Sequence, residues 1–149
     1  MNMSAVEETA RAAPAWLWTA GAVGTAWNVY GLYQYVGTLT PSGQAAMTAG
    51  MTAAQAALYL SLPAWISVVF AIGVAGGLAG SIALLLRRRA ALPIFAASLA
   101  GYVLLFAGDT YYGVFDAIPS QLVILAFVVA IAAALLAVAW QAGRRGLLC

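Results

Sequence analysis

The feature that constrains this chain most is a stretch without any charged side chain, from Ala12 to Leu86. Two further charge-free runs follow, from Ala90 to Gly108 and from Ala117 to Gly143. A helix that crosses a membrane needs about 20 mostly apolar residues, and the three runs have room for four such helices. Charged residues make up only 7% of the chain, against roughly 25% in a soluble domain. The sequence therefore predicts an all-α integral membrane protein.

We predict one domain over residues 1–149, a bundle of four transmembrane helices. The expected spans are residues 15–37, 64–86, 92–108 and 120–142. A proline lies beside each helix start, where a missing backbone N–H costs little. After the first helix, the TPS and SG signals indicate a loop.

A short helix is expected in the same connection, at about residues 53–62. Thr52 and Gln55 form a T-x-x-Q capping box at its start. The segment is too short to cross a bilayer. We expect it to lie at the outer interface, or to fold over the mouth of the bundle as a lid.

The arginines predict the topology. If the helices alternate in direction, every basic residue falls on one side: Arg11, Arg87, Arg88, Arg89, Arg144 and Arg145. Positive residues of short loops stay in the cytoplasm, so we expect both termini there, in the inner membrane of a bacterium. Glu7 and Glu8 stand where a signal peptide would be basic, which favours a short cytoplasmic tail. A secondary role of the arginine triplet in binding anionic lipid is open.

Small residues predict how the helices meet, because close backbone approach and interhelical hydrogen bonds hold helices together in lipid. The second helix has two interleaved GxxxG pairs, and small residues of the first helix share one face with Asn28. The expected packing positions are Gly21, Gly24, Gly31, Gly73, Gly76, Gly77, Gly80 and Gly101. The GxxxG face is also a candidate for joining two copies of the chain. The aliphatic fourth helix is expected to close the bundle.

The stretch AWNVYGLYQY places a primary amide, Asn28, near the middle of the first helix. In hydrocarbon such an amide needs a partner. One interpretation is an interhelical hydrogen bond that fixes packing. Another is a small cavity in which Asn28 orients a ligand together with Tyr30, Tyr33 or Gln34. A contact between the Asn28 residues of two protomers is the third.

The third helix has a polar stripe that includes Ser98, Tyr102 and Asp109. Asp109 is expected at the outer end of this helix, within reach of interfacial water, where a carboxylate need not be functional. Neighbouring aromatic residues are typical of an interfacial belt, and the alternative is an aromatic-lined outer pocket around Asp109. The candidate ligand-binding residues are Asn28, Tyr30, Tyr33, Gln34, Tyr102 and Asp109.

Composition excludes several functions. Histidine is absent and the only cysteine is Cys149, so metal sites of His and Cys and disulfides within the chain are excluded. The spans contain no catalytic carboxylate pair, so we expect no enzyme activity and no cofactor. Ion-coupled carriers need a charged group within the membrane, and the first helix has none. A net charge of +2 without a basic stripe argues against a nucleic-acid partner.

Two classes of function remain. Asn, Gln, Tyr and Trp side chains bind sugars without charge, so we expect the chain to bind or pass a small neutral solute. Passage requires a homo-oligomer, because one four-helix protomer is too small to enclose a pathway. The alternative is a non-catalytic accessory or scaffold subunit of a larger membrane complex, or a protein that binds lipid or pigment.

The stretches AWNVYGLYQY, LPAWISVVFAIGVAGGLAGSIALLLRRR and ALPIFAASLAGY resemble a family of small bacterial inner-membrane proteins often labelled sugar transporters. The resemblance extends from Trp16 to about Tyr112 and is weak in the fourth helix. It implies a four-helix inner-membrane fold and a sugar-like solute. The triple-helix repeat of the SWEET sugar carriers is absent from this sequence.

Overall fold

The computed structural model describes residues 12–149, and within that range the regular secondary structure is entirely helical. The helices are α2 (Ala15–Thr38), α3 (Pro41–Thr48), α4 (Ala53–Leu60), α5 (Ala64–Leu85), α6 (Ala91–Tyr111), α7 (Val114–Ala117) and α8 (Pro119–Arg144). Glu7, Glu8 and Arg11 of the expected tail lie outside the described residues.

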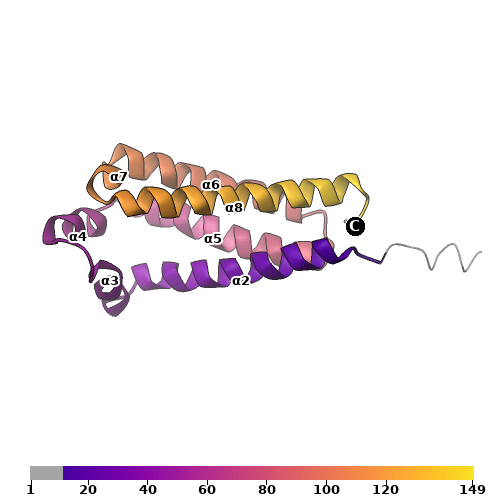
Figure 1. Cartoon of the computed structure of the whole chain (residues 1–149), viewed down its shortest axis with the longest axis horizontal. Coiled ribbons are helices and arrows are strands. Elements are labelled where there is room, and N and C mark those ends of the chain that lie inside the picture. Colours follow the sequence, from indigo (N-terminus) through magenta and orange to yellow (C-terminus); the bar gives the residue numbers. More distant parts are fainter. Residues whose placement is uncertain (1–11) are drawn as a thin grey trace, which may run out of the picture.

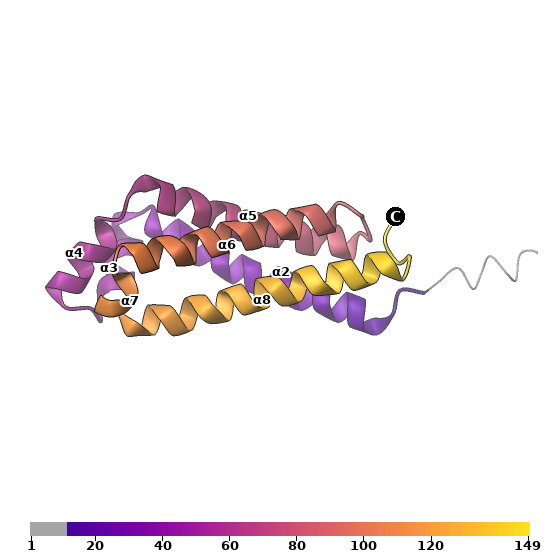
Figure 2. The same cartoon turned by 90° about the horizontal axis from the view of Figure 1, so that it is seen from above.

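The long helices α2, α5, α6 and α8 run side by side along the long axis of the molecule (Figure 1). The short helices α3, α4 and α7 gather at one end, called here the connector end (Figures 1 and 2). The opposite end carries the α5–α6 turn and the C-terminal residues, and is called the arginine end. α6 packs mainly on α5 and α8, whereas α2 packs mainly on α5 and crosses α8 obliquely (Figure 2).

Within the described chain, α5, α6 and α8 are long and apolar enough to cross a membrane. The protein is therefore an α-helical protein with the spans of a membrane protein. α2 has 24 residues but does not belong to that set. Its amides, tyrosines, tryptophans, threonines and glycines account for its lower hydropathy. A fourth crossing by α2 and the orientation of the termini stay predictions.

The chain after α2 corrects one expectation, because residues 41–48 form helix α3 and not a loop. Pro41 occupies the first turn, where its missing N–H has no helical partner to lose. The Thr40 side chain accepts a hydrogen bond from the Gly43 amide at 3.2 Å, as an N-cap does. The TPS motif is thus a helix start. α4 follows with both hydrogen bonds of its capping box in place, between Thr52 and Gln55.

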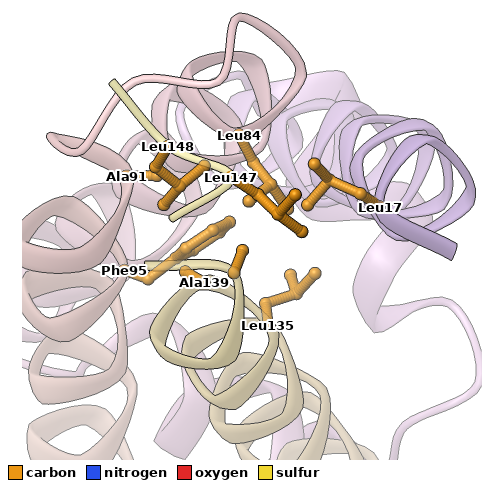
Figure 3. Packing of buried hydrophobic residues seen from close by; sticks show 9 residues of the cluster. Leu17, Leu84, Ala91, Phe95, Leu135, Ala139, Leu147 and Leu148 are labelled. Atoms are coloured by element: carbon orange, nitrogen blue, oxygen red, sulfur yellow. The ribbon is translucent and has the colours of Figure 1, made fainter. Parts of the chain in front are cut away.

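A cluster of buried apolar residues closes the arginine end: Leu17, Leu84, Ala91, Phe95, Leu135, Ala139, Ala142, Leu147 and Leu148. Figure 3 shows Leu147 and Leu148 lying among side chains from α2, α5 and α6. The chain reverses at Gly146, whose φ of 66° is a left-handed conformation that suits glycine. The Cys149 N–H then donates to the Arg87 carbonyl at 2.6 Å, and the Arg89 N–H to the Cys149 carbonyl at 2.9 Å. The last residues therefore fasten the α5–α6 turn.

Candidate functional site

Three glycines of α5 form its contact with α6. A Cβ at Gly73 would lie 2.6 Å from the Tyr102 ring, and one at Gly80 would lie 2.7 Å from the Phe95 ring. A Cβ at Gly76 would lie 3.0 Å from the Ser98 Cβ. The GxxxG face is thus covered within the chain, and its expected use for joining two copies is wrong.

The α5–α6 contact is also held by a hydrogen bond between the helices. The Ser98 hydroxyl donates to the Gly73 carbonyl at 2.5 Å. A Cβ at Gly101 would lie 2.9 Å from both the Gly73 nitrogen and the Val69 oxygen, so the two backbones approach each other closely. Tyr102, a candidate ligand-binding residue, is 4% exposed in this contact. Its ring serves as packing surface for Gly73.

The glycines of α2 face the rest of the bundle. A Cβ at Gly21 would lie 2.5 Å from Leu85, and one at Gly24 would lie 2.7 Å from the Ser81 hydroxyl. Gly31 has more room, with Val74 at 3.5 Å. The spacing of three and four residues therefore places these positions at the contact between α2 and α5.

Asn28 lies in the same contact and is 2% exposed. Its Nδ2 donates to the Gly24 carbonyl at 2.7 Å, within α2 and not across to another helix. Its amide lies against the backbone of Gly77, where a Cβ would be 2.7 Å from the Asn28 Cγ. The amide thus donates within its own helix and lies in the contact between α2 and α5.

The other candidates of α2 are not brought to Asn28. Tyr30 is 55% exposed and Tyr33 is 73% exposed, so both side chains point away from the bundle. Gln34 is partly exposed. The small cavity expected to unite Asn28 with these side chains is therefore not formed.

At the connector end, Asp109 is far more enclosed than expected. α6 continues to Tyr111, so Asp109 belongs to its last turn and is 8% exposed. The start of α5 packs against the same turn, where a Cβ at Gly108 would lie 2.6 Å from the Trp65 ring. The Asp109 Oδ1 is buried and has no hydrogen-bond partner among the described residues. The Oδ1 atom is thus shielded from water, whereas contact of the carboxylate with interfacial water through its other oxygen stays a prediction.

Aromatic side chains surround this turn. The rings of Trp65 and Tyr112 are 6.2 Å apart, and the Trp65 indole N–H points to the Tyr112 hydroxyl at 3.4 Å. Tyr59 of α4 is within range of the charge of Asp109. Burial raises the pKa of its phenol, and the negative charge of Asp109 raises that pKa further. Tyr111, in contrast, is 82% exposed, as expected of an interfacial belt residue.

Tyr59 is a site residue that the sequence did not single out. Gln55 and Tyr59 are four residues apart, so they share one face of α4. The Gln55 side chain donates to the Ala117 carbonyl at 2.8 Å and so attaches α4 to α7. The sequence alone identifies Gln55 only as a capping residue. The spacing of four residues between Gln55 and Tyr59 could have indicated that Tyr59 lies on the same face of α4.

Charge is divided between the two ends. Among the described residues, both acidic side chains, Asp109 and Asp116, lie at the connector end. The basic side chains lie at the other end: Arg87, Arg88, Arg89, Arg144 and Arg145. No basic residue of the described chain is therefore near enough in the fold to neutralise Asp109.

The arginines also make structural contacts. The Arg87 Nε donates to the Leu147 carbonyl at 2.9 Å. The Arg144 guanidinium lies 4.8 Å from the centre of the Trp140 ring, and that of Arg145 lies 5.7 Å from the Trp16 ring. These contacts anchor the arginine end in addition to any role of its charge in topology.

Within residues 12–149, no group of three or more His, Cys, Asp or Glu side chains is placed to hold a metal ion. The fold and its apolar helices define the class of the protein as a helical membrane protein. A comparison of the chain with protein-family models, curated proteins and solved structures found no match. The resemblance to small proteins labelled sugar transporters therefore stays an expectation.

Proposed function

We propose that this protein is a non-catalytic membrane protein that binds a small neutral, sugar-like solute at its connector end. The observation that carries the proposal is the buried Asp109 Oδ1, which lacks a hydrogen-bond partner among the described residues. An unpaired buried acceptor is costly, so a ligand that donates to it gains binding free energy. In this proposal the protein lies in a bacterial inner membrane with both termini in the cytoplasm.

The surroundings of Asp109 suit a polyhydroxylated solute. A carboxylate accepts several hydrogen bonds, and hydroxyl groups donate them. Binding sites for small molecules combine aromatic walls with a few polar groups. Trp65 and Tyr112 supply such walls, and Tyr59 contributes a phenol whose pKa is raised by the charge of Asp109 as well as by burial.

In this proposal the solute reaches the site by movement of α4. α4 has 8 residues, none of them fully buried, so little apolar burial holds it in place. Its hydrogen bond to α7 runs through one side chain, from Gln55 to the Ala117 carbonyl. We therefore assign α4 the role of a lid over Asp109.

Passage of the solute across the membrane would need more than one protomer. The interior of this bundle is filled by close contacts, such as those at Gly73 and Gly77. Since the α5 glycines are covered, a homo-oligomer would form through the outer surfaces of α2 and α8. Native mass spectrometry of the gently extracted protein counts the protomers directly.

Ligand-dependent thermal stability tests the binding site. A neutral sugar or polyol that binds the folded state raises the unfolding temperature in detergent in a concentration-dependent manner. Asp109→Asn should abolish the shift, whereas Asp116→Asn, at the same end of the molecule, should keep it. An equal shift in Asp109→Asn, no shift with any neutral solute, or a shift only with organic cations would contradict the proposal.

A second candidate function is that of an accessory subunit. It is favoured by α2, which is less apolar than the other long helices yet exposes Tyr33 to 73% and Val23 to 62%. A partner protein on this face would cover the aromatic side chains. A stoichiometric second protein in native mass spectra, lost in Tyr30→Ala/Tyr33→Ala, would support this function.

A further inference from the structure

A groove runs between α6 and α8 on the arginine half of the molecule, with a volume of about 390 Å³. Its walls are Leu92, Leu99, Ala133, Leu136, Ala137 and Trp140. The two alanines leave the hollow between larger side chains. Apart from the indole N–H of Trp140, every lining side chain is a hydrocarbon, so the groove suits an aliphatic occupant.

The groove has a direction. The two helices are antiparallel neighbours (Figure 1). Leu92 and Trp140 therefore lie toward the arginine end, and Leu99 and Ala133 lie closer to the middle of the bundle. The segment from Leu92 to Leu99 and the segment from Ala133 to Trp140 each cover about two helical turns, or about 10 Å. A hydrocarbon chain lying along it would reach from the end of the bundle toward its middle, as a lipid acyl chain does.

The mouth of the groove is basic. The Arg144 guanidinium lies 4.8 Å from the centre of the Trp140 ring, and Trp140 is a wall of the groove. Arg88 is exposed in the turn that leads into α6, and its carbonyl accepts the Ala91 N–H at 3.1 Å. Among the described residues, no Asp or Glu lies at this end. The charge at the mouth therefore complements an anion.

We propose that the groove between α6 and α8 binds one acyl chain of an anionic phospholipid, whose phosphate is held by Arg144 with Arg88 nearby. Tryptophan side chains lie at headgroup depth in membranes, so Trp140 marks the level at which acyl chain and headgroup meet. Basic residues next to pockets between membrane helices bind anionic headgroups. The site lies at the end opposite Asp109 and does not depend on the proposed solute.

Native mass spectrometry with two lipids tests this site. The full chain is presented with equal amounts of a phosphatidylglycerol and a phosphatidylcholine that have identical acyl chains. We expect one phosphatidylglycerol to be retained with a preference of about tenfold, which equals about 1.4 kcal/mol. Equal retention of the two lipids would overturn the proposal.

Matched variants separate headgroup from acyl chain. Arg144→Gln should remove most of the preference, and Arg144→Lys should keep much of it, because the charge remains. Arg145→Gln is the control, since Arg145 lies over Trp16 and not over Trp140. A preference unchanged in Arg144→Gln, or lost equally in Arg145→Gln, contradicts the assignment of the phosphate to Arg144.

Ala137→Leu fills the groove and should lower the retention of both lipids, whereas Ala134→Leu, on the same helix but outside the groove, should not. Equal retention in Ala137→Leu and the wild type would overturn the acyl-chain assignment. Displacement of the lipid by glycerol phosphate at equal concentration would overturn it as well, because the headgroup alone would then account for binding.

Discussion

The side-chain amide of Asn28 on α2 rests on the backbone of Gly77 on α5. A Cβ on residue 77 would overlap the Asn28 Oδ1 and would lie 3.0 Å from its Nδ2. The amide donates to the Gly24 carbonyl of its own helix, so its contact with α5 is one of shape. Together with the contacts at Gly21 and Gly24, this pair limits how closely α2 and α5 approach each other.

Gly77→Ala should therefore destabilise the protein by about 1–3 kcal/mol, the usual cost of overpacking a filled interior. Unfolding in mixed micelles measures the change. Gly143→Ala is the matched control, because nothing lies within 4 Å of a Cβ there, and alanine favours a helix by up to about 1 kcal/mol over glycine. Asn28→Ala in the Gly77→Ala background should recover part of the loss. Equal stabilities of the two glycine variants would show that the contact has no consequence.

The hydroxyl of Ser98 is expected to contribute to the α5–α6 contact. Ser98→Ala removes its hydrogen bond to the Gly73 carbonyl of the neighbouring helix, and such bonds contribute about 0.6–2 kcal/mol in membranes. Ser81→Ala is the comparison, since Ser81 donates to Gly77 within its own helix at 2.8 Å. We expect a clearly larger loss of stability for Ser98→Ala. A larger loss for Ser81→Ala would contradict the assignment.

The membrane character of the chain was predictable because it depends on local composition: α5, α6 and α8 lie largely in stretches without charged residues. The prediction of a loop after α2 was wrong, although the TPS and SG signals on which it was based are also local. Thr40 and Pro41 begin a helix as readily as they form a turn, and neighbouring contacts decide between the two.

The candidate site was predicted less well. Helical phase alone separates Asn28 from Tyr30, since two residues correspond to about 200° around a helix. Asn28 and Tyr30 were grouped because they are close in sequence. In the structure Tyr30 is exposed and Asn28 is buried, so the two side chains point in opposite directions from α2. The burial of Asp109 was not predictable in this way. It depends on Trp65 packing against the last turn of α6, and this contact joins two different helices.

The C-terminal residues are expected to stabilise the arginine end. Leu148 is 3% exposed within the buried cluster, so Leu148→Ala should cost about 2 kcal/mol or more. Leu86→Ala is the control, because Leu86 is 65% exposed. Thermal unfolding of both variants against the wild type gives the comparison. If both variants unfold at the same temperature, the packing of the tail contributes nothing to stability.

The influence of the Asp109 charge on Tyr59 predicts a change in the titration of the Tyr59 phenol. Burial raises the pKa of Tyr59 first, and the charge of Asp109 adds to it. Asp109→Asn removes only the second cause, so the Tyr59 pKa should fall while staying above its ordinary value. Tyrosinate absorbance during an alkaline titration follows the change, and the same titrations with Tyr59→Phe isolate the contribution of Tyr59.

Asp116→Asn is the control for that experiment, because Asp116 is exposed in α7 and does not contribute to the Tyr59 pKa. A lower Tyr59 pKa in Asp109→Asn alone would show that Asp109 is charged and that α4 lies over it. The same pKa in Asp109→Asn and the wild type would mean that α4 stands away from the carboxylate, and the role of α4 as a lid would then be wrong.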